Sequence, residues 1–258
     1  MAAAPGYGTI CSVTGSVVLG PMLAVVLVVL VALGAVVLWL GELGDARAVV
    51  IAAVRAVAQL AAVSFVITAI LRSGWWTALF VLLMFAVAAV TSARRIGALR
   101  DLAWIALAIA AGVAPVLAVI LGSGVLPLRP IAVVPIAGIV IGGAMTATSQ
   151  AARRALDELR TRHGEYEAAL ALGFLRRAAA LEICRPSAGQ ALIPALDQTR
   201  TVGLVTLPGA YVGVLLGGAS PVQAGVTQVL VLIGLLAAEA VAVLVIVQLV
   251  AAGLVARD

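Results

Sequence analysis

Five polar side chains lie in otherwise apolar stretches of this sequence and are the residues best suited to handle an ion. They are Arg55, Gln59, Asp197, Arg200 and Glu239. A charged side chain at membrane depth costs about 2.5–3.5 kcal/mol on insertion scales, and such groups either pair locally or mark a transport path. Both roles are open for each of the five, and we treat them as candidate residues of a translocation path.

The spacing of these residues indicates specific partners. Gln59 lies one turn after Arg55, so the two share a helix face. Asp197 and Arg200 are three residues apart, which suits a local ion pair. Glu239 is a lone acid flanked by alanines, and we expect it either to contact a cation or to form a salt bridge with Arg55.

The sequence contains no recognisable metal site. Hard cations take several oxygen ligands, and softer ones take His, Cys or Met. The single histidine, His163, is expected to be a solvated loop residue. Met145 marks the inner end of an apolar run and, with Thr146 and Thr148, could line a path. The metal ligands are therefore unknown at this stage.

The composition places the chain in the membrane. It is 64% hydrophobic and 10% charged, with a mean hydropathy of +1.25. Several apolar runs reach the ~20 residues that span a bilayer, and none alternates as a β-barrel strand would. We expect an all-α polytopic protein forming one transmembrane domain over residues 1–258.

Arginine is the basic residue used throughout, since none of the 16 basic residues is Lys. A P-loop needs its Lys to reach the nucleotide phosphates. We therefore do not expect this chain to hydrolyse ATP or to be an enzyme. The net charge of +5 is better explained by membrane orientation than by binding of nucleic acid.

Seven spans are predicted, and the first is expected to be a retained helix, since it is longer than the apolar region of a signal peptide and has no cationic segment before it. They are roughly Val17–Leu40, Ala48–Leu71, Trp75–Thr91, Leu102–Leu121, Ile131–Met145, Gln198–Gly217 and Gly225–Leu249.

The arginines set the orientation, because positive charge gathers on the cytoplasmic side. Placing residues 147–187 inside puts twelve arginines in the cytosol and leaves only Arg72 and Arg129 outside. The twelve are Arg47, Arg94, Arg95, Arg100, Arg153, Arg154, Arg160, Arg162, Arg176, Arg177, Arg185 and Arg257. We therefore expect a plasma or inner membrane protein with its N-terminus outside and its C-terminus in the cytosol. Cys11 and Cys184 then lie on opposite sides and should not pair.

The cytoplasmic segment 147–187 begins with a predicted extension of the fifth span. Asp157 with Arg160, and Glu158 with Arg162, are spaced for ion pairs along a helix. We expect a stalk that stops near Gly164.

A second helix is predicted from Glu165 to Cys184. Its apolar residues form one stripe: Leu170, Phe174, Ala178 and Leu181. Gly173 interrupts it and should bend it into two short helices, and Pro186 should end it after Arg185. Such an elbow could insert into a groove on a partner. The alternative is a helix on the inner leaflet, with Arg176, Arg177 and Arg185 near anionic lipid.

A spaced motif favours the partner. The segment reads E-A-A-x3-G-x9-I-x-R-P, formed by Glu167, Ala168, Ala169, Gly173, Ile183, Arg185 and Pro186. It resembles the EAA motif through which bacterial ABC-transporter permeases dock on a separate ATPase. Arg185 stands where that motif has Leu, so an apolar docking contact is replaced by a charge.

Three further stretches, residues 55–60, 135–145 and 193–209, are similar to the FetB-type permeases. That resemblance implies a permease, assembled as two copies with two ATP-binding subunits that hold ATP and Mg. It also implies export of a metal ion such as iron, while related plant proteins point to aluminium tolerance and nucleotide sugars.

Two glycine patterns indicate close helix packing, Gly138-x3-Gly142 and Gly209-x3-Gly213-x3-Gly217. They could form the seam of a homodimer or pack within one subunit. Pro208-Gly209 is expected to break the sixth span and provide a moving part. Two other hypotheses stay open: an ion-coupled secondary transporter using Arg55, Asp197 and Glu239 as relays, and a membrane scaffold.

Overall fold

The computed structural model describes residues 20–70 and 74–257 and divides into two compact units, residues 1–67 and 68–258. Regular structure in these described ranges is helical, apart from a single bridge between Val202 and Thr206. The prediction of an all-α polytopic membrane protein is therefore confirmed. The prediction of one domain stays a prediction, because each unit is described by itself. Cys11 and Arg72 lie outside the described residues.

The first unit is a pair of apolar helices, α1 (Pro21–Leu40) and α2 (Ala46–Ile70). Pro21 suits the first position of α1, because the nitrogen of that residue needs no helical partner. Gly34 of α1 faces α2, since a Cβ at residue 34 would lie 3.4 Å from the Cγ1 atom of Val49. Over the described residues, the first two predicted spans are both helices.

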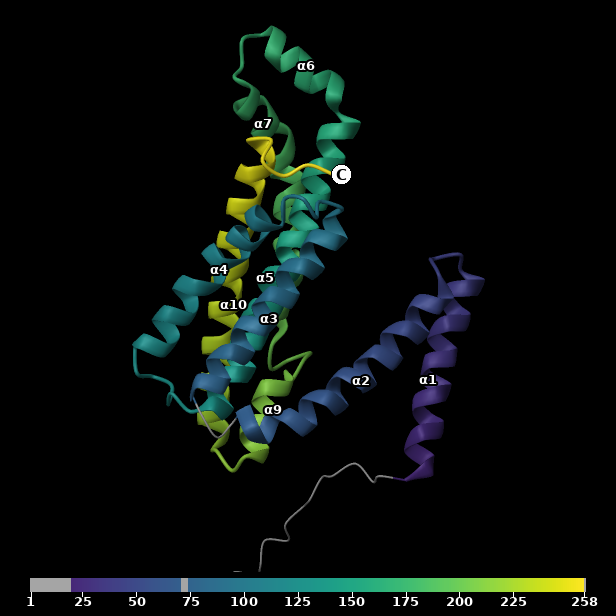
Figure 1. Ribbon diagram of the computed structural model, residues 1–258, viewed down its shortest axis with the longest axis vertical. Coiled ribbons are helices and arrows are strands. Elements are labelled where there is room, and N and C mark those ends of the chain that lie inside the picture. The colour runs from purple at the N-terminus through teal and green to yellow at the C-terminus, as the bar shows by residue number, and fades with distance from the viewer. Residues whose placement is uncertain (1–19, 71–73, 258) are drawn as a thin grey trace, which may run out of the picture. The chain divides into compact units, whose positions relative to one another are not determined.

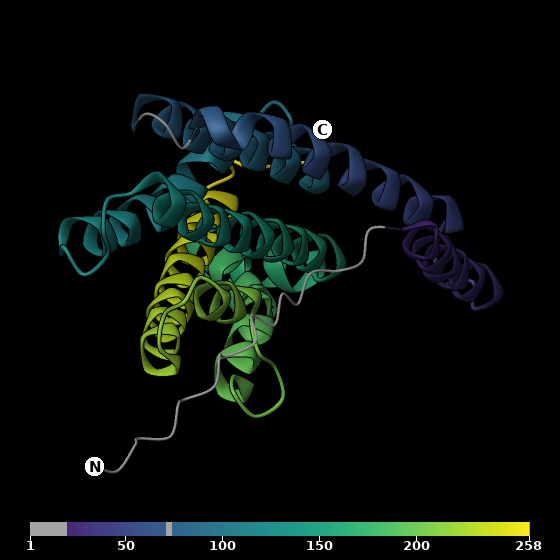
Figure 2. The same cartoon turned by 90° about the horizontal axis from the view of Figure 1, so that it is seen from below.

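The second unit holds the remaining helices (Figure 1). In chain order they are α3 (Gly74–Ile96), α4 (Leu102–Gly122), α5 (Pro130–Thr161), α6 (His163–Ala171), α7 (Arg176–Gly189), the 3-10 turn η1 (Gln190–Leu192), α8 (Ile193–Thr201), α9 (Gly209–Leu216) and α10 (Pro221–Ala251). Helix α5 contacts α3, α4, α7 and α10, and it lies in the middle of the unit when seen end-on (Figure 2).

Small residues bring the central helices close together. Alanines along α5, α7 and α10 are buried, and the largest fully buried side chains include Ile105, Ile109 and Ile246. A methyl group added at Gly112 of α4 would overlap the backbone carbonyl oxygen of Ala238 on α10. In a membrane the hydrophobic effect does not drive helices together, so close van der Waals packing of this kind stabilises their association.

No helix within the sixth predicted span, Gln198–Gly217, is long enough to cross a bilayer, so the prediction of a spanning helix there is wrong. The chain there forms α8, an irregular turn and α9, and six helices in the described ranges are long and apolar enough to cross a bilayer. Gly203 has a φ of +83° and donates its backbone N–H to the Thr206 carbonyl at 2.9 Å. The predicted interruption at Pro208-Gly209 is confirmed, since Pro208 caps α9.

The predicted stalk is confirmed. Helix α5 has 32 residues, which gives a length of about 48 Å at 1.5 Å per residue. A hydrocarbon core is only about 30 Å thick, so one end of α5 must extend beyond it. The predicted ion pairs differ: Asp157 pairs with Arg257 at 2.7 Å, and Arg162 pairs with Glu165.

Candidate functional site

The candidate docking elbow consists of α6, the turn Leu172–Leu175 and α7. Gly173 has a φ of +92°, a conformation that glycine adopts without steric cost. The Gly173 N–H donates to the Leu170 carbonyl at 2.9 Å, and the Phe174 N–H donates to the Ala169 carbonyl at 3.1 Å. This pair of bonds is a Schellman motif, which ends a helix at a left-handed residue.

The Schellman motif explains part of the sequence pattern physically. Ala169 is the last residue of the E-A-A triplet, and its carbonyl accepts the longer of the two bonds. Gly173 stands four residues later, at the position where the motif needs a positive φ. The predicted bend at Gly173 is confirmed, and the x3 spacing is the distance between these two positions of the motif.

The tip of the elbow is apolar and exposed. Leu172 is 81% exposed, Leu175 is 79% exposed and Phe174 is 51% exposed. The predicted single stripe through Leu170 and Leu181 is wrong, because the chain turns at Gly173 and the two arms present different faces. The buried face of α7 instead carries Ala179, Ala180, Ile183, Cys184 and Ala188.

The start of α6 is held by an ion pair between Arg162 and Glu165. The Arg162 Nε atom donates to the Glu165 Oε1 atom at 2.8 Å. Their hydrogen bond raises the pKa of Arg162 and lowers the pKa of Glu165. On the same helix the Glu167 carboxylate lies 3.5 Å from the His163 Nδ1 atom, and both side chains are exposed. Ala168 is also exposed, while Ala169 is half-buried.

Helix α7 ties the elbow to the bundle. Ile183 and Cys184 are buried, and the Cys184 thiol donates to the Ala155 carbonyl of α5 at 3.5 Å. Burial, with a smaller effect of Glu158, raises the pKa of the Cys184 thiol to about 11. A thiol with that pKa stays protonated near neutral pH and is a poor nucleophile.

The prediction that Arg185-Pro186 ends the helix is wrong. Helix α7 runs on to Gly189 with Pro186 inside it. Proline removes one hydrogen-bond donor from a helix, but Pro186 lies on the exposed side, where its ring does not disturb the packing against α5. Arg185 is exposed as well, so this charge is available to a partner or to solvent.

Glu239 of α10 is the buried acid of the bundle, with 7% of its surface exposed. Its carboxylate lies against Gly143 of α5, since a Cβ at residue 143 would be 2.5 Å from the Glu239 Oε1 atom. Among the described residues it has no hydrogen bond or ion pair. The glycine therefore provides the space that the carboxylate occupies.

The other path candidates are distributed over separate helices. Asp197 and Arg200 lie on α8, exposed, with 3.7 Å between the Arg200 Nη1 and Asp197 Oδ1 atoms, so the local pair is confirmed. Met145 is half-buried on α5. Arg55 and Gln59 lie one turn apart on α2, in the first unit. The salt bridge between Arg55 and Glu239 stays a prediction, because the two units are described separately.

Several polar contacts in the bundle were not predicted. Ser92 of α3 and Ser149 of α5 share a buried hydrogen bond of 2.9 Å. The Thr148 hydroxyl and the Gln228 carbonyl oxygen are buried with no partner among the described residues. Within those residues, no group of three or more His, Cys, Asp or Glu side chains is placed to hold a metal ion. Serines 57 positions apart carry no local signal, so these contacts require the fold.

An apolar cavity of about 440 Å³ lies at the opposite end of the second unit from the elbow. Its walls come from α5, α9 and α10 and include Ile131, Pro135, Ile139, Gly213 and Thr227. Pro135 lacks a backbone N–H, so one carbonyl of the preceding turn is left without its helical partner. The cavity therefore adjoins a weakened turn of α5.

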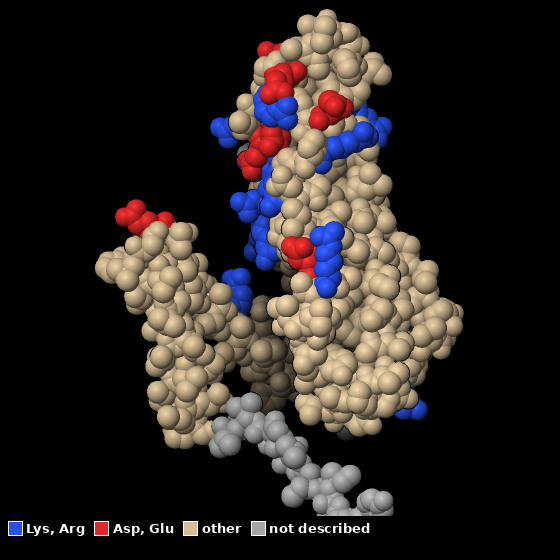
Figure 3. Space-filling view, turned by 180° about the vertical axis from the view of Figure 1, so that it is seen from behind, with Lys and Arg blue, Asp and Glu red and all other residues tan. Residues whose placement is uncertain are grey.

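Charged side chains of the second unit gather at the end that carries the elbow (Figure 3). The C-terminal tail is fixed there by two contacts. The Ala256 N–H donates to the Asp101 carboxylate at 2.9 Å, and Arg257 pairs with Asp157 of the stalk. The turn between α3 and α4, the stalk and the tail thus lie together, as the arginine pattern predicts.

The long apolar helices define the class: the chain is a multi-pass helical membrane protein. It belongs to UPF0014, described as an uncharacterised protein family, whose model matches residues 21–255.

Relatives from plants and bacteria agree with this assignment. The chain is 36% identical over 192 residues to the UPF0014 membrane protein STAR2 of Oryza sativa subsp. japonica, covering 72% of this chain and 67% of that protein. It is 33% identical over 200 residues to the UPF0014 membrane protein YjkA of Bacillus subtilis, covering 76% and 80%. The probable iron export permease protein FetB of Escherichia coli is 33% identical over 142 residues, covering 55% and 54%. The resemblance to FetB-type permeases is thereby confirmed. No solved structure matches significantly.

Proposed function

We propose that this chain is the membrane-spanning subunit of an ABC transporter, driven by a separate ATP-binding subunit that docks on the elbow. The observation that carries the proposal is an exposed apolar tip whose two arms are both tied to the bundle. Exposed Leu172, Phe174 and Leu175 suit insertion into a hydrophobic groove on a partner.

The arms of the elbow offer a route for movement. Helix α6 follows the stalk of α5 directly, and α7 packs against α5 and α10. ATP and Mg would bind to the partner, and closure of two ATP-binding subunits would tilt α5 and α7 in each copy of a homodimer. In this arrangement the elbow lies in the cytosol, the C-terminus is cytoplasmic and the N-terminus is outside the plasma or inner membrane.

The proposed substrate is a metal ion such as iron, moved outward. The support is the similarity to FetB, a probable iron export permease. The chain is also similar to Protein ALUMINUM SENSITIVE 3 of Arabidopsis thaliana, and a different cargo such as a nucleotide sugar is the alternative. Glu239, with its carboxylate in the bundle, is the proposed contact for a cation.

Copurification with a matched pair of variants tests the docking. Phe174→Glu places a charge on the tip of the elbow, and Leu128→Glu places the same charge on an exposed residue of the turn before α5. We expect an ATP-binding subunit to copurify from native membranes with the unaltered protein and with Leu128→Glu, and to be lost with Phe174→Glu. ATP-dependent metal transport in inverted vesicles should be lost with it. Transport that persists in Phe174→Glu after the ATPase is lost would refute the proposal.

A second candidate is an ion-coupled secondary transporter, favoured by the buried Glu239 carboxylate. It predicts transport that follows a proton or ion gradient in vesicles without ATP. Glu239→Gln should then abolish transport, while Phe174→Glu should leave it unchanged. The two candidates thus give opposite results for the variant at the tip.

A further inference from the structure

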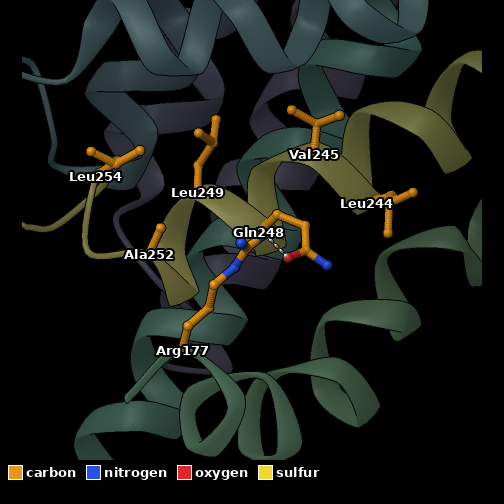
Figure 4. A pocket seen from close by; sticks show the side chains of 7 residues that line it. All are labelled: Arg177, Leu244, Val245, Gln248, Leu249, Ala252 and Leu254. Atoms are coloured by element: carbon orange, nitrogen blue, oxygen red, sulfur yellow. Dashed lines mark hydrogen bonds between the residues drawn. The ribbon is translucent and has the colours of Figure 1, made fainter. Parts of the chain in front are cut away.

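A groove with one cationic side chain lies between α7 and the inner end of α10 (Figure 4). Its volume is about 380 Å³. The walls are apolar apart from two residues, and they consist of Arg177, Leu244, Val245, Gln248, Leu249, Ala252 and Leu254. It belongs neither to the tip of the elbow nor to the surroundings of Glu239.

The polar edge of the groove carries a positive charge that no carboxylate neutralises among the described residues. The Arg177 Nη2 atom donates to the Gln248 Oε1 atom at 2.6 Å, which holds the guanidinium over the end of α10 (Figure 4). A guanidinium has five N–H donors, so four remain. Among the described residues, Arg177 has no carboxylate partner. The edge of the groove is therefore complementary to an anion.

The level of the groove along α10 matches a membrane interface. Leu244 lies 23 residues after the start of α10 at Pro221, or about 35 Å along the axis at 1.5 Å per residue. With Pro221 placed at the outer edge of a hydrocarbon core about 30 Å thick, Leu244 and Gln248 would lie near the inner boundary between hydrocarbon and headgroups. Between Glu239 and Arg257, Gln248 is the one side chain with a polar group.

We propose that this groove binds one anionic phospholipid of the cytoplasmic leaflet. The lipid phosphate meets the Arg177 guanidinium, and an acyl chain lies along Leu244 and Val245. Basic pockets between membrane helices on the cytoplasmic side bind the headgroups of anionic lipids. An acidic protein segment would satisfy Arg177 but would leave the apolar walls in contact with lipid tails or water, so the lipid fits both parts of the groove.

Native mass spectrometry of the full-length protein, titrated with dioleoylphosphatidylglycerol, tests this site. Arg177→Gln removes the charge, and Arg160→Gln removes an exposed arginine from the end of the stalk as a matched control. Ala252→Trp keeps Arg177 and fills the groove. An arginine near anionic lipid contributes about fivefold in affinity. We expect Arg177→Gln to weaken the tightest lipid by at least that factor, Ala252→Trp to abolish its binding, and Arg160→Gln to change it less than twofold.

Three results would overturn the proposal. Equal weakening by Arg177→Gln and Arg160→Gln would mean diffuse attraction by surface charge. Equal affinity for dioleoylphosphatidylcholine would mean that the groove does not distinguish an anionic lipid from a zwitterionic one. A change of oligomeric state in Arg177→Gln with unchanged lipid binding would assign the groove to a second copy. Helical content by circular dichroism identifies a variant that fails to fold, and in that case Ala252→Trp decides the question alone.

Discussion

Gly143 provides the sharpest test of how the bundle accommodates a buried acid. A methyl group at residue 143 would overlap the Leu235 Cδ1 atom and would lie 2.5 Å from the Glu239 Oε1 atom. Both are the ends of flexible side chains, so they can rotate away. The neighbouring Gly142 has nothing within 4 Å of its Cβ position, which makes Gly142→Ala a matched control one residue away on the same helix.

Two opposing contributions set the stability of Gly143→Ala. Replacing glycine by alanine in a helix gains about 1 kcal/mol, and overpacking a close contact costs about 1–3 kcal/mol. We therefore expect Gly143→Ala to be destabilised by about 0–2 kcal/mol, while Gly142→Ala is stabilised by up to about 1 kcal/mol. Thermal unfolding in detergent, followed by tryptophan fluorescence, measures the difference.

Transport should fall as well as stability, because the Glu239 carboxylate must leave its place against α5. We expect transport in vesicles to fall at least about tenfold in Gly143→Ala, which corresponds to 1.4 kcal/mol of misplacement, and to stay unchanged in Gly142→Ala. Adding Gly143→Ala to Glu239→Gln should then cost little more, because both changes act on one group. Equal melting temperatures and equal transport in the two alanine variants would refute the reasoning.

Three shorter predictions follow. Gly173→Ala forces a side chain into a positive φ at a cost of about 1–2 kcal/mol, and it should reduce copurification of the ATP-binding subunit. Gly164 has no positive φ and no atom within 4 Å of its Cβ position, so Gly164→Ala should not reduce it. Equal copurification of the two variants would contradict the role of the Schellman turn. Because the pKa of Cys184 is raised from 9.0 to about 11, its contribution to stability should be full below pH 9 and lost as the pH rises through 11. In a Cys11→Ser background, maleimide should therefore label Cys184 at neutral pH only after unfolding, and rapid labelling of the folded protein would show that the thiol is accessible. Gly112→Ala meets a backbone oxygen of Ala238 that cannot rotate away, so its melting temperature should fall further than that of Gly143→Ala, and an equal fall would indicate that α4 and α10 can separate.

The elements with strong local signals were predictable from the sequence. The stalk follows from a long run of helix-forming residues, and the bend follows from a glycine between two short helices. The local pair of Asp197 and Arg200 follows from its spacing alone. Each of these depends on residues fewer than about twenty positions apart.

The features that depend on long-range packing were not predictable. Helix α7 continues through Pro186 because its opposite face is held against α5, which the proline signal does not reveal. The break at Pro208-Gly209 is predicted from the sequence, whereas the turn at Gly203, which also separates α8 from α9, is not. Gly143 and Glu239 are 96 positions apart, so only the fold brings them together.

Helix α5 can transmit movement along its length as well as span the membrane. It connects the elbow at one end to the cavity near Ile131 at the other, and the chain between Pro135 and Thr161 contains no break. At 1.5 Å per residue that uninterrupted part is about 39 Å long, so a tilt of about 5° at the elbow displaces the other end by roughly 3 Å. A displacement of that size is comparable to the contact distance between two methyl groups. It is enough to open or close an apolar constriction without unwinding a helix.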